Sequence, residues 1–151
     1  MKGLLTVFFT LIFFNINSQV DFIQGGGTLD DWANLAKYRS ANLEIIKNPI
    51  DNLVVFMGNS ITENWSTFRP GFFQNNSFLN RGISGQTTPQ MLIRFKPDVV
   101  NLNPKAVVIL AGINDIAGNT GPVTIENIAE NIFSMAEIAL ANNIEVFICS
   151  V

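Results

Sequence analysis

Three short segments of the chain hold the residue types that acyl-transfer chemistry uses. Ser60 offers a hydroxyl that could act as a nucleophile, Gly82 offers a backbone N–H, and Asn114 offers a side-chain amide. A nucleophilic serine needs such donors, because they stabilise the oxyanion that forms when the hydroxyl attacks a carbonyl. It also needs a base, and the 151 residues include no histidine. The sequence therefore predicts an acyl site that lacks one of its usual parts.

Each of these residues follows an apolar run that we expect to form a strand. The expected elements alternate, with strands at 53–57, 77–80, 106–111 and 145–151 and helices at 30–47, from about 61, at 88–102 and at 123–142. Pro97 should kink or split the third helix. This alternation predicts an α/β fold with a parallel sheet covered on both faces. The loops at the carboxyl ends of such strands form the ligand crevice, so the three residues should converge if the first strand is central.

Each residue also has a purely structural interpretation. Ser60 and Glu63 fit a capping box, in which the serine caps a helix and the glutamate binds back to it. Gly82 could be a turn glycine with positive φ, and Asn114 with Asp115 could hydrogen-bond its own backbone. By spacing alone, capping is the more frequent role for Ser60. The occurrence of all three residues after three successive strands is what favours a shared site.

The N-terminal segment and the composition indicate export and exclude several kinds of partner. A short basic start, an apolar run over 4–14 and a polar end at Ser18 predict a secretory signal over 1–18. The apolar run is too short to span a bilayer, which needs about 20 residues. Removing the signal leaves 8 Lys and Arg against 12 Asp and Glu, a net charge of −4, so the chain should bind nucleic acid poorly. A single cysteine, Cys149, without histidine predicts no internal disulfide and no zinc site, and no cofactor is expected.

Three sequence blocks resemble those of the SGNH hydrolases, also called GDSL-type lipases and acylhydrolases. The stretches at 56–62, 80–88 and 112–115 are similar to the family's first three blocks, in that order. The segment at 31–35 is similar to the secreted acetylhydrolase-like branch. The resemblance implies a three-layer, flavodoxin-like parallel sheet over 19–151. It also implies that Ser60 is the nucleophile and that Gly82 and Asn114 belong to the oxyanion hole.

The chain departs from this family's pattern in two places. The family usually has aspartate where this chain has Asn59, which changes the charge beside the nucleophile. The family's last block, an Asp and a His three residues apart, is absent, and we expect it to lie beyond Val151. The sheet would then be truncated after its fourth strand. Asp115 is a poor substitute for that histidine, because an imidazole takes the serine proton and returns it to the leaving group.

The resemblance implies a secreted or periplasmic serine esterase that cleaves carboxylic esters of small molecules or carbohydrates through an acyl-serine intermediate. Short acyl groups, including acetyl esters on carbohydrates, are the expected substrates. The chain alone should be inactive for lack of the histidine. The alternative is a non-catalytic module that binds a glycan or a carboxylate in the same crevice. A flavodoxin-like cofactor binder is disfavoured, because Glu63 and Trp65 crowd the loop where a phosphate would bind.

Overall fold

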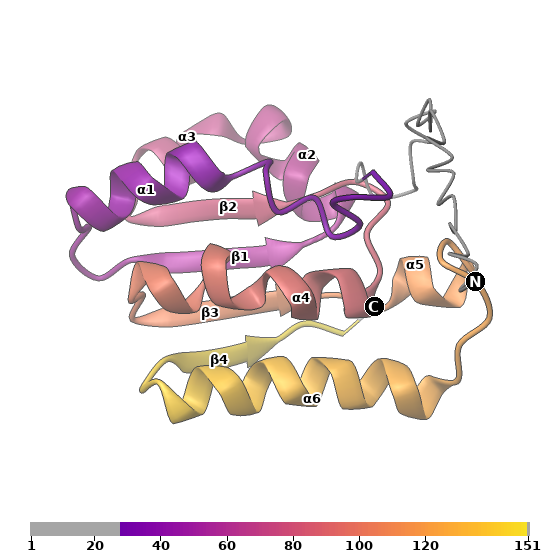
Figure 1. Ribbon diagram of the computed structural model, residues 1–151. Helices are drawn as coiled ribbons and strands as arrows, with labels where there is room; N and C mark the ends of the chain where they lie inside the picture. The colour runs from indigo at the N-terminus through magenta and orange to yellow at the C-terminus, as the bar shows by residue number, and fades with distance from the viewer. Residues whose placement is uncertain (1–27, 151) are drawn as a thin grey trace, which may run out of the picture.

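The fold is built on a parallel sheet of four strands. The computed structural model describes residues 28–150, and the expected signal at 1–18 lies outside them. The strands β1 (Val54–Gly58), β2 (Phe78–Gly82), β3 (Ala106–Leu110) and β4 (Glu145–Ile148) lie in the order β2-β1-β3-β4 (Figure 1). β1 is therefore central, between β2 and β3. Gly58 pairs with both Gly82 and Leu110, so these three strands end level at one edge of the sheet.

Helices cover both faces of this sheet, which gives the expected three layers (Figure 1). One face carries α1 (Arg39–Lys47), α4 (Thr88–Asp98) and α6 (Ile125–Ala141), and the other carries α2 (Ser60–Phe68) and α3 (Pro70–Gln74). The short α5 (Ile113–Ile116) follows β3. A 3₁₀ turn, η1 (Val100–Leu102), follows α4, so the expected break near Pro97 is confirmed. The α/β fold class is also confirmed, and no helix within 28–150 is long and apolar enough to cross a membrane.

Apolar side chains fill the gaps between the sheet and both helix layers. On the side of α4 and α6, Val55 and Met57 of the central strand are buried in one cluster with Phe95 and Met135. On the other side, the Phe56 ring has its centroid 5.3–5.6 Å from those of Trp65, Phe72, Phe73 and Phe78. Aromatic pairs of this kind contribute about 0.5–1.5 kcal/mol beyond their burial. The central strand is thus packed from both faces, which fixes the position of its carboxyl end.

The first helix begins at Arg39, which is later than the expected start at residue 30. The Asp31 carboxylate accepts hydrogen bonds from the backbone N–H groups of Leu35 and Ala36, at 2.7 and 2.9 Å. These bonds hold turns over 32–38, because a carboxylate that binds backbone N–H groups offers them an alternative to the helix. The predicted start was wrong for this reason. The other expected elements agree with the structure to within a few residues.

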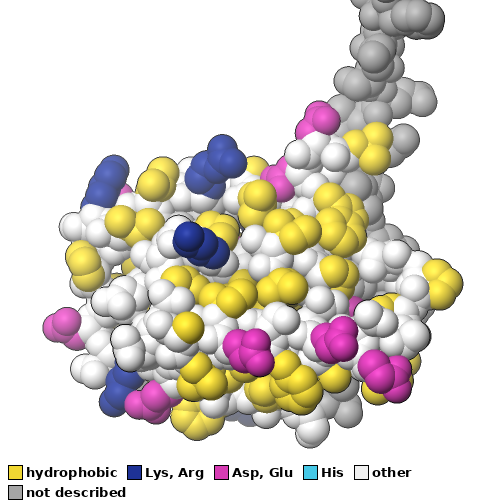
Figure 2. Space-filling view, turned by 60° about the horizontal axis from the view of Figure 1, so that its bottom comes forward, with side chains coloured by type: hydrophobic (Ala, Val, Ile, Leu, Met, Phe, Trp, Pro, Cys, Tyr) yellow, Lys and Arg dark blue, Asp and Glu magenta, His cyan; other side chains and the backbone are white. Residues whose placement is uncertain are grey.

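The surface over α4 and α6 combines exposed apolar side chains with acidic ones (Figure 2). Ile93 on α4 and Phe133 on α6 are 50% and 58% exposed. Acidic side chains line the outer side of α6 at Glu126, Glu130 and Glu137. This face therefore shows no continuous basic stripe of the kind that binds a phosphate backbone.

Candidate active site

Ser60 lies directly after the central strand, at the first position of α2. β1 ends at Gly58, Asn59 is the helix cap, and Ser60 begins the helix. The N–H groups of a first helical turn have no acceptor within the helix and favour negative charge near them. Ser60 is half-buried, and its hydroxyl has no hydrogen-bond partner among residues 28–150. The hydroxyl is therefore free to meet a ligand.

Asn59, not Ser60, caps α2, so the capping-box interpretation of Ser60 with Glu63 was wrong. The Asn59 Oδ1 accepts a hydrogen bond from the Ile61 N–H at 3.0 Å. The Asn59 side chain is fully buried, and its Nδ2 has no hydrogen-bond partner in the part of the chain that the structure describes. Because Ser60 is not used as a cap, the strongest structural alternative to a chemical role is removed.

Glu63 holds the loop that follows β2 instead of capping its own helix. Its carboxylate accepts hydrogen bonds from the Ser84 N–H, at 2.7 Å, and from the Ser84 hydroxyl, and it pairs with Lys37. Burial opposes the charge on Glu63, but the hydrogen bonds from Lys37 and Ser84 outweigh it and hold the pKa of this carboxyl below its usual value. The loop at 83–86 is thereby fixed beside the helical turn that carries Ser60.

Gly82 lies where β2 passes close to the backbone of α2. A Cβ at this position would lie 2.2 Å from the Glu63 backbone nitrogen and 2.8 Å from the Asn59 carbonyl oxygen. The Gly82 N–H donates to the Asn80 Oδ1 at 2.8 Å, so this N–H is already engaged. Close packing explains the glycine, and its predicted place in the oxyanion hole stays a prediction.

Gly85, in the same loop, was not singled out from the sequence. Its φ of 80° is a conformation that favours glycine. Its N–H has no acceptor among the described residues, whereas its carbonyl accepts a hydrogen bond from the Asn119 amide at 3.0 Å. The Asn114 side chain binds Gln86, the residue that follows Gly85, because its Nδ2 donates to the Gln86 carbonyl at 2.9 Å. The Asn114 amide therefore lies against the residue that follows Gly85.

Asn114 and Asp115 lie in α5, at the carboxyl end of β3. The Asn114 Nδ2 carries two hydrogens, and the bond to Gln86 uses one of them. Asp115 is buried, and its carboxylate accepts hydrogen bonds from the Thr88 N–H, at 2.9 and 3.0 Å, and from the Thr88 hydroxyl, at 2.6 Å. Asp115 thus holds the first turn of α4. The structure places the Asn114 amide against the loop after β2 and gives Asp115 a structural role, while the place of Asn114 in an oxyanion hole stays a prediction.

A buried polar network lies beneath these loops. Arg94 on α4 is fully buried and donates to the Gly58 carbonyl, to the Gln86 side chain and to the Asp98 carboxylate. Burial lowers the pKa of Arg94, and the nearby negative charge of Asp98 counters this effect. This network was not predicted from the sequence. The available signal was an arginine and an aspartate four residues apart, Arg94 and Asp98, on the same helix face as Met91 and Phe95.

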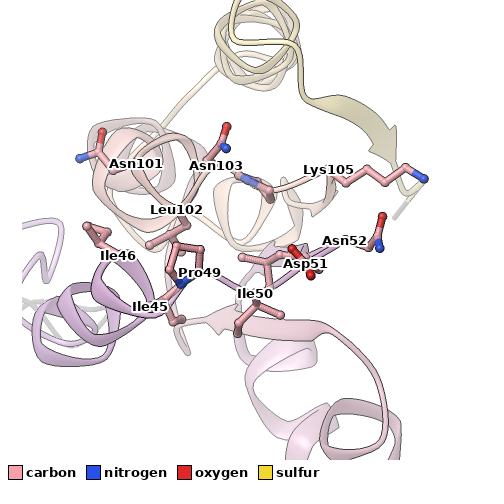
Figure 3. A pocket seen from close by; sticks show the side chains of 12 residues that line it. Ile45, Ile46, Pro49, Ile50, Asp51, Asn52, Asn101, Leu102, Asn103 and Lys105 are labelled. Carbon is pink, nitrogen blue, oxygen red and sulfur yellow. The ribbon is translucent and has the colours of Figure 1, made fainter.

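A hollow of about 430 Å³ lies at the opposite edge of the sheet, where β1 and β3 begin (Figure 3). Its lining includes Ile46 and Ile50 together with Asn52 and Asn103. Because Ser60 lies beyond the carboxyl end of β1, this hollow is separate from the candidate active site. Within the described range, no group of three or more His, Cys, Asp or Glu residues could hold a metal ion.

Comparison with known proteins finds relatives in both sequence and structure. The GDSL-like Lipase/Acylhydrolase family matches residues 56–150, which is more than half of the chain. A candidate acylhydrolase from Bacteroides fragilis is 50% identical, with a TM-score of 0.75 over 78% of this chain. A GDSL-like lipase from Bacteroides thetaiotaomicron is 48% identical, with a TM-score of 0.74 over 77% of this chain. The chain spans 57% of the length of each of these two structures.

A curated relative matches a shorter stretch. YqeF, an uncharacterised lipoprotein of Bacillus subtilis, is 46% identical over 43 residues. The match covers 28% of this chain and 18% of the relative.

Proposed function

The chain belongs to the GDSL-like lipase/acylhydrolase family, and we propose that it carries the nucleophile and the oxyanion hole of a serine esterase. Ser60 would attack the carbonyl carbon of a carboxylic ester, the alcohol would leave, and water would release the acid from the acyl-serine. The favoured substrates are short acyl esters of small molecules or carbohydrates, including acetyl esters. This substrate class rests on the similarity of the segment at 31–35 to the secreted acetylhydrolase-like branch.

The position of Ser60 is the observation that carries the proposal. Its hydroxyl has no internal partner, it opens a helix at the end of the central strand, and the loops after β2 and β3 are bonded together beside it. A serine used only for structure would be expected to cap the helix, and Asn59 does that instead. The arrangement supports attack on a carbonyl whose oxygen faces the first turn of α2.

Three donors are proposed for the oxyanion hole. The first two are the Ser60 backbone N–H and the free N–H of the Asn114 amide. For the third, the resemblance to the family implies Gly82, but the Gly82 N–H already donates to Asn80. The Gly85 N–H has no acceptor among the described residues and adjoins the residue that Asn114 binds, so we favour Gly85 for this role. Removing one such donor typically lowers the rate by about 10²–10³.

The residues that the structure describes include no histidine to serve as a base for Ser60. The Asp115 carboxylate already accepts hydrogen bonds from the Thr88 N–H and hydroxyl. We therefore propose that residues 1–151 acylate slowly at Ser60 and that a base added in solution accelerates the reaction. Imidazole is suitable, because it can take the serine proton as the Ser60 oxygen attacks and return it to the leaving alcohol.

The experiment is acetylation of the purified chain by p-nitrophenyl acetate, with and without imidazole, read by peptide mass spectrometry. The readout is the rate at which Ser60 gains an acetyl group, which background hydrolysis of the ester does not affect. Ser60→Ala and Ser40→Ala are matched controls, because Ser40 is an exposed serine on α1 whose hydroxyl makes no hydrogen bond to the described loops of the site. Imidazole-dependent acetylation of Ser60 supports the proposal. Labelling spread equally over exposed serines contradicts it.

A second candidate function is a module that binds a glycan or a carboxylate without cleaving it. The same donors that would stabilise an oxyanion would bind the oxygen of a carboxylate. This candidate predicts saturable binding of acetate, followed by amide NMR shifts, that survives Ser60→Ala and is weakened by Asn114→Ala. Acetylation of Ser60 in imidazole would decide against it.

We also propose that residues 1–18 direct export. The relative YqeF is a lipoprotein, and no helix within residues 28–150 could span a membrane. Expression in a bacterial host, followed by fractionation and N-terminal sequencing, tests this. Export predicts a mature chain that begins at Gln19, and retention in the cytoplasm with Met1 in place contradicts it.

A further inference from the structure

Arg94 is a fully buried cation in a small domain, which is an uncommon and costly arrangement. Lys, Arg, Asp and Glu are almost never fully buried unless they are paired, because removal of a charge from water must be compensated. Arg94 has such compensation from three directions. Its Nη1 donates to the Asp98 carboxylate at 2.9 Å, its Nη2 to the Gly58 carbonyl at 3.0 Å, and its Nε to the Gln86 side-chain oxygen at 2.5 Å.

Two of these three partners belong to the loops of the candidate active site. Gly58 ends the central strand, two residues before Ser60. Its carbonyl also accepts a hydrogen bond from the Ile83 N–H at 3.0 Å, so it already joins β1 to the loop after β2. Arg94 therefore binds the backbone at the point where these two segments meet.

Gln86 extends the connection to the third loop. It is fully buried, its side-chain oxygen accepts from Arg94, and its own carbonyl accepts from the Asn114 amide. Its side-chain nitrogen donates to the Ala33 carbonyl at 2.7 Å. One guanidinium thus links the strand end before the nucleophile to the residue that orients Asn114.

The third partner of Arg94 is Asp98, which connects the guanidinium to residues of α1 and β2. The free oxygen of Asp98 accepts a hydrogen bond from Asn42 on α1 at 2.6 Å, and the Asn42 side-chain oxygen accepts two from Arg81 on β2, at 2.7 and 2.9 Å. This part of the network stabilises the fold without contact to Gly58 or Gln86. The chain therefore offers a natural control, because the two halves of the network can be altered separately.

We propose that Arg94 is a positioning residue. Through its bonds to Gly58 and Gln86, it sets the distance between the Ser60 turn and the loop that carries Gly85, to which the Asn114 amide is bonded at Gln86. We call these two bonds the Arg94 clamp. This inference rests on the proposed function. The planar fork of a guanidinium serves acceptors in several directions at once, whereas the compact ammonium of lysine does not. Arg94→Lys should keep the charge beside Asp98 and lose the clamp.

The test compares Arg94→Lys with Asn42→Ala, which weakens the rest of the network and leaves the clamp intact. Both are measured at a temperature where circular dichroism shows them folded. The first readout is the rate at which a fluorophosphonate labels Ser60 in the presence of imidazole. In this reaction the Ser60 oxygen bonds to phosphorus, fluoride leaves, and imidazole takes the serine proton. We expect a loss of at least about tenfold in Arg94→Lys and a change of less than about twofold in Asn42→Ala. Equal rates in the two variants would overturn the proposal.

A second readout separates this inference from the proposed function. The amide NMR signals of Ser60 and Gly85 report the two loops even if Ser60 does not react. The clamp predicts that Arg94→Lys displaces or broadens both signals and that Asn42→Ala leaves them in place. If wild-type Ser60 is not labelled, the esterase proposal fails. The clamp is then judged from the NMR signals of Arg94→Lys alone: displaced Ser60 and Gly85 signals support it, and unchanged signals overturn it. If Arg94→Lys does not fold, Gln86→Met replaces it and the same displacement is expected. Gln86→Met removes the bond from Arg94 and also the Gln86 bond to the Ala33 carbonyl, so its control is Gln86→Glu, which loses the bond to Ala33 and keeps an acceptor for Arg94.

Discussion

The Glu63 carboxylate accepts both the backbone N–H and the hydroxyl of Ser84 on one oxygen, and this contact joins α2 to the loop after β2. Lys37 occupies the other oxygen. The residue three positions after Ser60 therefore holds the residue just before Gly85. The spacing between the candidate nucleophile and a candidate oxyanion donor depends in part on a charged group at the rim of the site.

We expect Glu63→Gln to reduce stability at neutral pH by at most about 1 kcal/mol, because the group is partly exposed and solvent screens it. The effect should depend on pH. The pKa of Glu63 is lower in the folded chain than its usual value of 4.5, so the ionised carboxylate contributes stability above that value. The contribution is lost as the pH falls through the folded-state pKa. Thermal unfolding of both proteins from neutral to acidic pH measures this.

The control for this prediction is Glu137→Gln, which removes an exposed carboxylate on α6 far from Ser84 in the sequence. The melting temperatures of the wild type and Glu63→Gln should approach each other in acid. A difference between them that stays constant from neutral to acidic pH would show that Glu63 acts through packing and not through its charge.

Gly82→Ala should be strongly destabilising. The added Cβ would meet backbone atoms of α2, the nearest at 2.2 Å, and backbone cannot rotate away as a side chain can. Overpacking of this kind costs about 1–3 kcal/mol. Gly71→Ala is the matched control, because its Cβ would meet only the end of the Asn75 side chain, at 3.3 Å. Urea unfolding of the two variants should separate them, and similar midpoints would contradict the close approach of β2 and α2.

The strands and the meeting of their carboxyl ends could be predicted from sequence, because apolar runs without polar alternation indicate buried parallel strands. The start of α1 could not be predicted from sequence. The apolar spacing indicates a helix from residue 30, but the Asp31 carboxylate accepts hydrogen bonds from the Leu35 and Ala36 N–H groups and holds this segment in turns. The spacing of Ser60 and Glu63 was also ambiguous, and only the fold shows that Glu63 turns to Ser84. The spacing of Arg94 and Asp98 was a local sign of an ion pair, but no local pattern could reveal the bond from Arg94 to Gly58, which lies 36 residues away.

Asp115 should be structural and not a base. Asp115→Asn keeps one side-chain acceptor for Thr88 and loses the charge, so we expect it to unfold at a lower temperature than the wild type. Per folded molecule, the rate of Ser60 acetylation without imidazole should stay within about threefold of the wild type, because a removed catalytic base would cost about 10² or more. The measurement combines thermal unfolding with the mass-spectrometric rate. A large loss of rate in a fully folded variant would assign Asp115 to the chemistry.

The capping role of Asn59 can be isolated by comparing two substitutions at that one position. Asn59→Ser and Asn59→Ala both shorten the side chain and both remove the buried Nδ2 that has no partner among the described residues. They differ in one hydroxyl, which in the serine variant can still accept a hydrogen bond from the Ile61 N–H. Serine and asparagine are comparable caps, and loss of a cap costs about 1 kcal/mol. The serine variant should therefore be more stable than the alanine variant by about that amount in urea unfolding, and equal stability would show that the Asn59 bond to Ile61 contributes nothing to α2.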